Sequence, residues 1–304
     1  MTRSLIIIGG GPSALTAAIY AGRASLKPLV FAGNMPGGQL MLTSEVENFP
    51  GFDEPILGPE LMERWRKQAA RYGAEIEDED VTAVDFSKQP FRVTAAGQIH
   101  ESRSVIVATG ATAKWLGIPN EQRLIGKGVH TCAQCDGFAY TGKHVVVVGG
   151  GDTAMEETTT LAKIAAKVTV VHRRNELRAS KIMAERVRQN PKVEFIWNTA
   201  VEDVIGDLRT TGVKLKNLET NTVREFPCDG LFVAIGYTPA TAFLKGQLEL
   251  NEKGYVVVHD HTRTTVEGIF AAGDVENFRY RQAVTAAGAG CAAAIDAERW
   301  LATQ

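Results

Sequence analysis

The chain has 304 residues, of which 44% are hydrophobic and 22% are charged. These are ordinary values for a globular protein with a full core, and the length corresponds to about two domains. Thirty-three Lys and Arg residues against 35 Asp and Glu give a formal net charge of −2. Proteins that bind a nucleic-acid backbone usually carry a basic excess. Neither a disordered chain nor a nucleic-acid-binding protein is therefore expected.

The uncharged segment Ser4–Gly22 could be mistaken for a signal peptide or a membrane span. Three consecutive glycines and Pro12 interrupt it, which instead indicates a strand, a glycine turn and a helix. We expect no targeting segment and no membrane span. Cysteines are too few for a disulfide scaffold, so a reducing, cytoplasmic setting is predicted. The four are Cys132, Cys135, Cys228 and Cys291.

One sequence pattern occurs twice, over Ile6–Ala14 and again over Val146–Ala154. Each copy is an apolar run, a triplet of glycines and the start of a helical segment. Each half also closes on an apolar run that ends in glycine, Val105–Gly110 and Leu231–Gly236. The sequence therefore predicts an α/β fold with two Rossmann-like, three-layer dinucleotide-binding domains.

The chain continues beyond the second closing strand with another apolar strand, Gly268–Asp274, and an alanine-rich helix, Arg281–Leu301. No third glycine fingerprint accompanies them, so this tail is expected to complete the first domain. The second domain, residues 116–240, is then inserted into the first, residues 1–113 and 243–304. Crossovers near residues 112–116 and 240–244 would permit one domain to rotate against the other.

The first glycine motif, Gly9-x-Gly11-x-x-Ala14, matches the dinucleotide fingerprint. Gly9 permits the tight turn, Gly11 allows a pyrophosphate to approach the backbone, and Ala14 allows close helix–strand packing. Pro12 suits the first turn of a helix, whose N-terminus attracts negative charge. The acid that usually reads a ribose is missing, since the next strand ends at Ala32. A glycine turn that binds nothing is the alternative.

The second motif, Gly149-x-Gly151-x-x-Ala154, is followed at the ribose-reading position by His172, Arg173 and Arg174, with Arg178 one turn later. Guanidinium groups at that place would bind a 2′-phosphate through charge-assisted hydrogen bonds. The motif therefore favours NADPH over NADH. The alternative is a basic run on a solvated surface.

A Cys132-x-x-Cys135 pair directly precedes the second glycine motif. Such a spacing indicates a redox dithiol or half of a metal site. His130 could be a third metal ligand, but zinc usually takes four, and the dithiol is favoured because two nucleotide-binding units could supply its electrons. Asp136 could donate a proton to a departing thiolate, or it could simply cap a turn. The acidic segment Glu75–Asp80 is expected to be a solvated loop.

Taken in order, these motifs resemble the low-molecular-weight thioredoxin reductases along essentially the whole chain. The matching stretches are Gly9–Ala14, Gly37–Leu40, Glu47–Gly51, Ala108–Gly110, Cys132–Asp136, Gly149–Glu157, His172–Arg178, Gly268–Val275 and Arg281–Ala283.

The resemblance implies FAD on the first domain and NADPH on the inserted one. The residues implied for FAD are Gly9, Gly11, Pro12, Ser13, Ala14, Gly38, Gln39, Leu40, Asn48, Ala108, Thr109, Gly110, Gly273, Asp274, Arg281, Gln282 and Ala283. Those implied for NADPH are Gly149, Gly151, Asp152, Thr153, Ala154, His172, Arg173, Arg174, Arg178, Ile235 and Gly236. The family also implies a homodimer, and no metal site is expected.

The implied reaction is the reduction of thioredoxin or a thioredoxin-like protein. NADPH would reduce FAD, FAD would open a Cys132–Cys135 disulfide, and the dithiol would exchange with the partner's disulfide. By analogy, Cys135 interacts with the flavin, Cys132 attacks the partner, and Asp136 is the acid, with inter-domain rotation between the two stages. Two alternatives remain: a ferredoxin-driven flavin thioredoxin reductase, and a flavin- or zinc-binding redox sensor without turnover.

Overall fold

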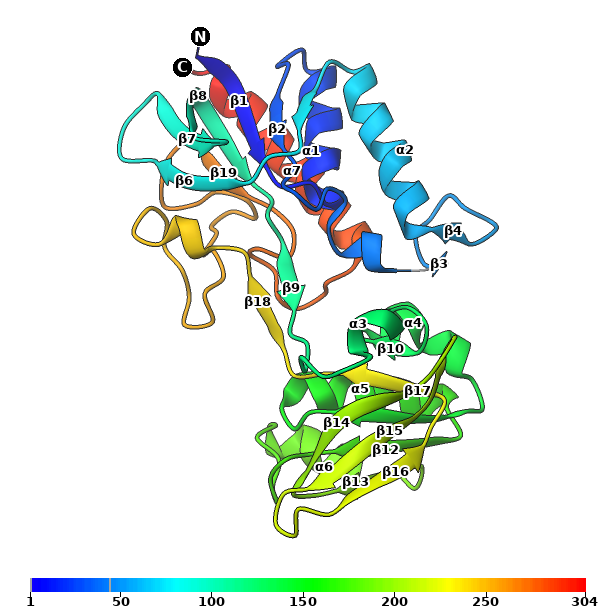
Figure 1. Ribbon diagram of the computed structural model, residues 1–304. Helices are drawn as coiled ribbons and strands as arrows, with labels where there is room; N and C mark the ends of the chain where they lie inside the picture. Colours follow the sequence, from blue (N-terminus) through cyan, green and yellow to red (C-terminus); the bar gives the residue numbers. More distant parts are fainter. Residues whose placement is uncertain (1, 44) are drawn as a thin grey trace. The chain divides into compact units, whose positions relative to one another are not determined.

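The computed structural model describes residues 2–43 and 45–304 and contains two compact units. The first unit consists of residues 1–112 and 238–304, and the second of residues 113–237. In Figure 1 the second unit is the green to yellow part of the chain from α3 to β17, while the blue and cyan segments and the gold, orange and red segments form the first. The second unit is thus an insertion into the first.

Nine strands and three α-helices lie wholly within the described part of the first unit, together with two short 3₁₀ helices. Before the insertion they are β1 (Arg3–Ile8), α1 (Pro12–Arg23), β2 (Leu29–Phe31), η1 (Gly38–Leu42), β3 (Glu45–Val46), β4 (Ile56–Leu57), α2 (Gly58–Arg71), β5 (Glu75–Glu77), β6 (Val81–Asp85), β7 (Phe91–Ala95) and β8 (Gln98–Val107). After it come η3 (Ala242–Leu244), β19 (Ile269–Ala271) and α7 (Ala283–Leu301).

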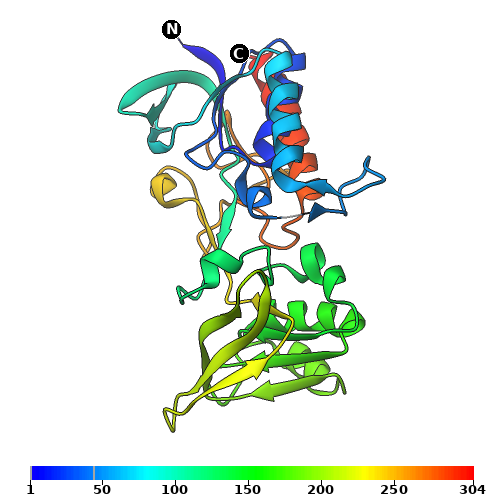
Figure 2. The ribbon, with the colours of Figure 1, turned by 45° about the vertical axis from the view of Figure 1, so that its right-hand side comes forward.

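The main sheet of the first unit has the order β5-β2-β1-β8-β7-β6, and β19 pairs with β8. Strand β1 is buried on both faces: Leu5 and Ile7 belong to the core beneath α1 and α7, and Ile6 and Ile8 to the core on the other face. Figures 1 and 2 show α1 and α7 side by side. They approach so closely that a Cβ atom on Gly290 would overlap the carbonyl oxygen of Ser13.

The acidic segment that was expected to be a loop contains a strand. Glu75–Glu77 forms β5, the edge strand that pairs in parallel with β2. The prediction of a loop was wrong because backbone pairing with a distant strand outweighs the low strand propensity of glutamate. Arg3 and Glu75 form an ion pair of 2.6 Å across this edge.

The second unit also contains a parallel sheet, built from the second strand–turn–helix. Its elements are α3 (Glu121–Leu124), β10 (Val129–His130), α4 (Ala133–Asp136), η2 (Gly137–Tyr140), β11 (His144–Val148), α5 (Asp152–Ile164), β12 (Lys167–Val171), α6 (Lys181–Arg188), β13 (Val193–Ile196), β14 (Thr199–Gly206), β15 (Thr210–Asn217), β16 (Val223–Pro227) and β17 (Gly230–Val233).

Five of these strands form a parallel sheet in the order β10-β17-β11-β12-β13. Helix α5 covers one face through Met155 and Leu161, and the antiparallel sheet β14-β15-β16 covers the other through Val213 and Leu215. Figure 2 shows this small sheet lying over the larger one. Helix, sheet and second sheet form the three layers of this unit, and the α/β class with two Rossmann-like units is confirmed.

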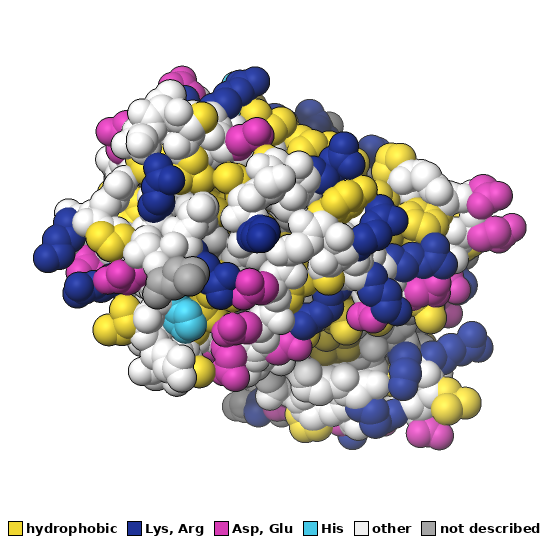
Figure 3. Space-filling model, turned by 90° about the horizontal axis from the view of Figure 1, so that it is seen from above, with side chains coloured by type: hydrophobic (Ala, Val, Ile, Leu, Met, Phe, Trp, Pro, Cys, Tyr) yellow, Lys and Arg dark blue, Asp and Glu magenta, His cyan; other side chains and the backbone are white. Residues whose placement is uncertain are grey.

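Two chain segments connect the units, and they contain the short strands β9 (Ala111–Ala113) and β18 (Tyr237–Pro239), which pair with each other. None of the helices in the described residues is long and apolar enough to cross a membrane. On the face drawn in Figure 3, Lys and Arg side chains are interspersed with Asp and Glu side chains.

Candidate active site: a disulfide and two glycine turns

The first glycine turn joins β1 to α1 and has the backbone that its sequence requires. Gly9 has φ +132°, and a Cβ atom there would overlap the carbonyl oxygen of Ala108. Gly11 is the N-cap of α1, where no side chain caps the helix, and a Cβ atom on it would meet nothing within 4 Å. The first N–H groups of α1 therefore face an open space without a side-chain acceptor, which suits an anionic group.

Other predicted residues of the first unit lie around this turn. The N–H of Gly37 donates to the carbonyl of Gly10 over 3.0 Å, which brings η1, with Gly38, Gln39 and Leu40, beside the turn. From the other side, a Cβ atom on Gly273 would lie 2.7 Å from Ser13 Oγ. The ends of β1 and β19 thus meet at the start of α1.

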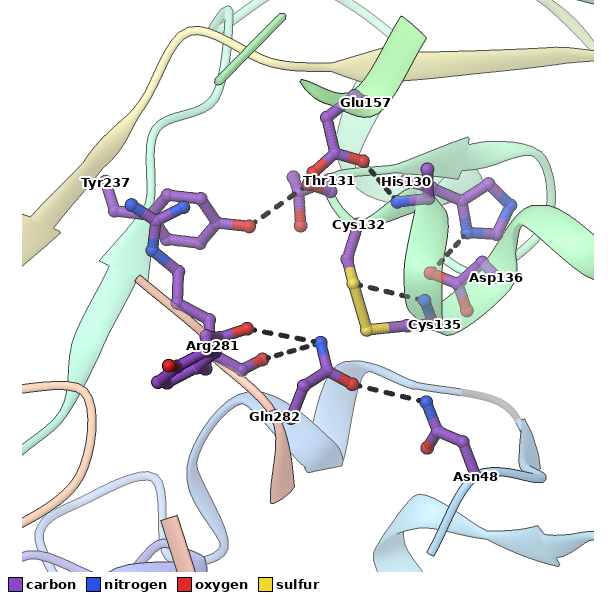
Figure 4. Close-up of a disulfide and its surroundings, with 12 residues drawn as sticks. Asn48, His130, Thr131, Cys132, Cys135, Asp136, Glu157, Tyr237, Arg281 and Gln282 are labelled. Carbon is purple, nitrogen blue, oxygen red and sulfur yellow. Dashed lines mark hydrogen bonds and ion pairs between the residues drawn. A yellow bond between two sulfur atoms is a disulfide. The ribbon is translucent and has the colours of Figure 1, made fainter. Parts of the chain in front are cut away.

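The chain from Asp274 to Ala283 borders the same region. Burial raises the pKa of Asp274 to about 6, although Arg281 opposes that shift, and burial together with Asp274 raises the pKa of Glu276 to about 7. Gln282 is the N-cap of α7, one residue later than the predicted start of that helix. Asn48 Nδ2 donates to Gln282 Oε1 over 3.3 Å (Figure 4). Thr109 follows the C-terminal end of β8, which lies beside the first glycine turn, and donates its hydroxyl to the carbonyl of Ala240 over 2.9 Å.

The second glycine turn joins β11 to α5 in the same manner. Gly149 has φ +152°, and a Cβ atom there would lie 2.7 Å from Ala154 Cβ. Gly151 is the N-cap of α5, has no side-chain cap, and faces open space. Asp152 Oδ1 accepts the N–H of Ser180 over 2.8 Å, which holds the segment after β12 against the first turn of α5, where Thr153 also lies.

The residues after β12 divide into a buried histidine and three exposed arginines. Within residues 2–43 and 45–304, no carboxylate forms an ion pair with Arg173, Arg174 or Arg178. The backbone N–H of Arg178 donates to the carbonyl of Gly150 over 2.7 Å, so this basic segment is attached to the glycine turn. Ile235 and Gly236, which follow β17, complete the predicted set, with Ile235 exposed.

His172 is buried instead of presenting its ring to solvent. A Cβ atom on Gly150 would overlap the imidazole, and Trp197 packs edge-on against the ring at 6.3 Å. Burial lowers the pKa of His172, and the neighbouring arginines lower it further. Its Nε2 atom has no hydrogen-bond partner among the described residues. His172 thus supports the glycine turn as a neutral ring, and the arginines carry the charge.

Cys132 and Cys135 form a disulfide whose Cα atoms are 5.3 Å apart. Cys132 is the N-cap of α4, and its Sγ accepts the N–H of Cys135 over 3.2 Å (Figure 4). Both side chains are half-buried at the start of that single helical turn. No group of three His, Cys, Asp or Glu residues in the described parts of the chain is arranged to hold a metal ion.

Asp136 and His130 lie behind the disulfide and face each other. Asp136 Oδ2 is 3.1 Å from His130 Nδ1, and His130 Nε2 is 2.8 Å from the hydroxyl of Tyr140 (Figure 4). The ring proposed as a third metal ligand therefore contacts the carboxylate. Sequence reasoning gave Tyr140 no role, because its contact with His130 depends on how β10 and η2 pack together.

Two further contacts hold the segment that carries the cysteines. The carboxylate of Glu157, on α5, accepts the N–H of Ala133, the first residue of α4. The hydroxyl of Tyr237 donates to the carbonyl of Thr131 over 3.1 Å. Glu157 lies within a stretch that matches the family, but no local pattern in the sequence indicated what its side chain contacts.

The sequence pattern of one family, described as pyridine nucleotide-disulphide oxidoreductase, matches residues 3–290. The chain belongs to this family. It is 53% identical to a thioredoxin reductase of Streptomyces coelicolor over 303 residues, and the aligned region covers 99% of this chain and 94% of that protein. The structure of a thioredoxin reductase from Giardia duodenalis is similar to that of this chain, with a TM-score of 0.95 and 46% sequence identity. That match covers 99% of this chain and 100% of the Giardia chain.

A third relative joins two activities in one polypeptide. It is a bifunctional thioredoxin reductase/thioredoxin of Mycobacterium leprae, 50% identical over 301 residues that cover 98% of this chain and 66% of that protein. These similarities place the chain among the thioredoxin reductases, and they confirm the predicted family and the prediction of a disulfide oxidoreductase. They also favour a disulfide reductase driven by a pyridine nucleotide over both alternatives, the ferredoxin-driven enzyme and the non-catalytic sensor.

Proposed function

We propose that this thioredoxin reductase uses FAD and NADPH to reduce thioredoxin or a thioredoxin-like protein through Cys132 and Cys135. The observation that carries the proposal is the disulfide at the start of α4, in the same unit as a second glycine turn flanked by exposed arginines. A redox disulfide in the same unit as a nucleotide-binding turn fits a reductase driven by a pyridine nucleotide.

The two glycine turns support two dinucleotides. At Gly11 and at Gly151, a Cβ atom would project into open space, and each adjoining helix begins without a side-chain cap. A pyrophosphate could therefore receive hydrogen bonds from the first N–H groups of α1 and of α5. Arg173, Arg174 and Arg178 fit a 2′-phosphate on the second dinucleotide, because the described residues offer these guanidinium groups no carboxylate partner. FAD, when bound, would accept two electrons from NADPH and pass them to the disulfide.

The protein's own part of the reaction is thiol–disulfide exchange. The Cys132 thiolate would attack one sulfur of the partner's disulfide, which forms a mixed disulfide and releases the partner's other sulfur as a thiolate. Asp136 would give a proton to that thiolate. Cys135 would then attack Cys132 Sγ, re-forming the disulfide and releasing the partner as a dithiol. Cys228 is unsuited to such a step, because burial raises the pKa of its thiol to about 12.

The partner, the assembly and the location form part of the same proposal. The relative that contains both a reductase and a thioredoxin supports a thioredoxin-like partner. Cys228 and Cys291 are free thiols, which fits the reducing environment of the cytoplasm. The homodimer and the rotation of the units about their two connections follow from the family resemblance, and light scattering on the purified protein would test the first of them.

The test is anaerobic reduction of the flavin in the purified protein by NADPH and by NADH, followed by oxidised thioredoxin. Rapid bleaching by NADPH, slower bleaching by NADH, and recovery of the oxidised flavin spectrum with thioredoxin are expected. Bleaching without recovery would remove thioredoxin as the acceptor. No bleaching by either nucleotide would indicate another electron donor and would contradict the role given to the arginines.

A further inference from the structure

Three polar side chains behind the disulfide form one continuous chain of contacts. Asp136 Oδ2 lies 3.1 Å from His130 Nδ1, and His130 Nε2 lies 2.8 Å from the hydroxyl of Tyr140. His130 is at the end of β10, Asp136 ends α4 directly after Cys135, and Tyr140 ends η2. The side chains of His130 and Asp136 are only 7% and 16% exposed, so water contributes little to their solvation.

Aromatic rings pack against the imidazole of His130. Phe232 of β17 stacks on the His130 ring at 5.3 Å, and Tyr140 packs edge-on against both rings. The charged and titratable groups nearest Tyr140 are Asp136, Asp229 and the Cys228 thiol, together with Lys143 Nζ, which lies 5.3 Å from the centre of the tyrosine ring. Asp136 is the carboxylate in direct contact with the imidazole.

The contact with Tyr140 allows His130 to carry or to lack a proton without moving. A neutral imidazole that donates from Nδ1 to Asp136 can accept the tyrosine O–H at Nε2. A protonated imidazole donates from both nitrogens, and the hydroxyl then accepts from Nε2. Burial, followed by the charges of Asp136 and Asp229, raises the pKa of Tyr140, so its hydroxyl keeps its proton in both states. Both nitrogens of the imidazole therefore keep a hydrogen-bond partner in either state.

We propose that His130 is a positioning residue for Asp136, and that the two side chains share one proton which Asp136 delivers during thiol–disulfide exchange. This inference rests on the proposed function. When the partner's S–S bond breaks, the leaving sulfur takes the electron pair of that bond and a proton from the Asp136 carboxyl. A proton taken up later from solvent by the His130–Asp136 pair restores the hydrogen bond between His130 Nδ1 and Asp136 Oδ2.

The test uses substitutions that each remove one member of the contact network formed by Asp136, His130 and Tyr140. His130→Asn keeps a donor near the Nδ1 position but cannot be protonated, Tyr140→Phe removes only the hydroxyl, and Asp136→Asn removes the acid. His144→Asn is the matched control, since His144 is a partly buried histidine of the same unit that contacts Thr169, 2.8 Å away.

The flavin-loaded protein is reduced anaerobically with dithiothreitol, freed of excess reductant, and treated with iodoacetamide over a range of pH. The rate of alkylation at Cys132 is then measured by mass spectrometry.

Only the thiolate form of a cysteine is alkylated, so the alkylation rate depends on the fraction of Cys132 that is deprotonated. A charge near the thiol changes that fraction, and the rate therefore reports such a charge. The pH profile of alkylation in His130→Asn should differ from that of the wild type, because the variant cannot hold the shared proton. Tyr140→Phe should change the profile as well, since the imidazole loses its hydrogen-bond partner. Thioredoxin turnover in His130→Asn should fall about tenfold, with no further fall when Asp136→Asn is added. Flavin reduction by NADPH should be unchanged.

A profile for His130→Asn that matches the wild type, or losses from His130→Asn and Asp136→Asn that multiply in the double variant, would overturn the inference. A changed profile in His144→Asn would do the same, because the effect would then not be specific to His130. If His130→Asn does not fold, Tyr140→Phe decides: an alkylation profile that matches the wild type contradicts the shared proton. Alkylation requires neither NADPH nor thioredoxin, so failure of the proposed function would leave this result interpretable.

Discussion

The carbonyl oxygen of Ala108 occupies the position that a Cβ atom on Gly9 would need, whereas a Cβ atom on Gly11, two residues later, would project into open space. Gly9 also has a backbone φ of +132°, a value that residues with a side chain rarely adopt. One glycine of the turn is therefore required by the fold. The other is not, and its lack of a side chain leaves room for a ligand beside α1.

Gly11→Ala should fold normally and lose flavin, because its methyl group would fill the space that a pyrophosphate needs. Gly9→Ala should lose at least about 2 kcal/mol of unfolding free energy from strain and overlap. The flavin absorbance of each purified variant, set against its urea midpoint, separates the two effects. Full flavin content in Gly11→Ala would contradict the pyrophosphate site at α1.

Alanine substitution of Arg173, Arg174 or Arg178 should raise the KM for NADPH about tenfold in each case, because each removes a charge-assisted hydrogen bond to the 2′-phosphate. The kcat should change little, and the KM for NADH should stay the same. Arg188→Ala, an exposed arginine in the last turn of α6, is the matched control. Equal losses with both nucleotides would show that these arginines do not recognise the 2′-phosphate.

Glu157→Ala should slow thioredoxin reduction about tenfold and leave flavin reduction by NADPH intact. The carboxylate accepts the N–H of Ala133, a buried residue, and loss of that acceptor costs about 1–3 kcal/mol at the start of the helix that carries both cysteines. Glu157→Gln keeps an acceptor oxygen, so its rate of thioredoxin reduction should lie between those of Glu157→Ala and the wild type. The neighbouring exposed residue provides the control, Glu156→Ala, whose steady-state rates should equal those of the wild type.

The free energy of unfolding should fall as pH rises from about 4.5 to 7. Burial raises the pKa of Glu276 to about 7 and that of Asp274 to about 6, so the folded protein binds more protons than the unfolded chain between the ordinary carboxyl pKa and these values. Stability contributed by the protonated acids is therefore present at low pH and lost as pH rises.

Glu276→Gln should remove the upper part of this slope and stabilise the protein at pH 8 by about 1 kcal/mol, a value reduced for partial exposure to solvent. A smaller slope from Asp274 should remain between about pH 4 and 6. Urea unfolding at several pH values, with matched flavin content, measures both. Glu252→Gln, an exposed residue, should follow the wild type, and a Glu276→Gln curve parallel to the wild type would contradict the shift.

Features that depend on a few consecutive residues could be predicted from the sequence. The glycine turns before Pro12 and Asp152 lie where the strand–turn–helix pattern places them, because strand, turn and helix are local choices. The contacts of Glu157 with Ala133 and of His130 with Asp136 could not be predicted, since packing of separate elements creates them.

The same reason explains the error at β5. Its charged residues resemble a loop until pairing with β2 is known. His172 was placed correctly after β12, but its burial against Gly150 could not be read from the sequence, because it depends on how the segment folds back over the glycine turn.

The most direct test of the central claim is whether Cys132 itself joins to thioredoxin. Thioredoxin with a single active-site cysteine, activated as a mixed disulfide with thionitrobenzoate, is mixed with reduced Cys135→Ser and with reduced Cys132→Ser. Cys291→Ala, which keeps both active-site cysteines, is the control. The account predicts rapid thionitrobenzoate release and a covalent adduct with Cys135→Ser, and little of either with Cys132→Ser. An adduct that forms equally well through Cys135, or none with either variant, would contradict it.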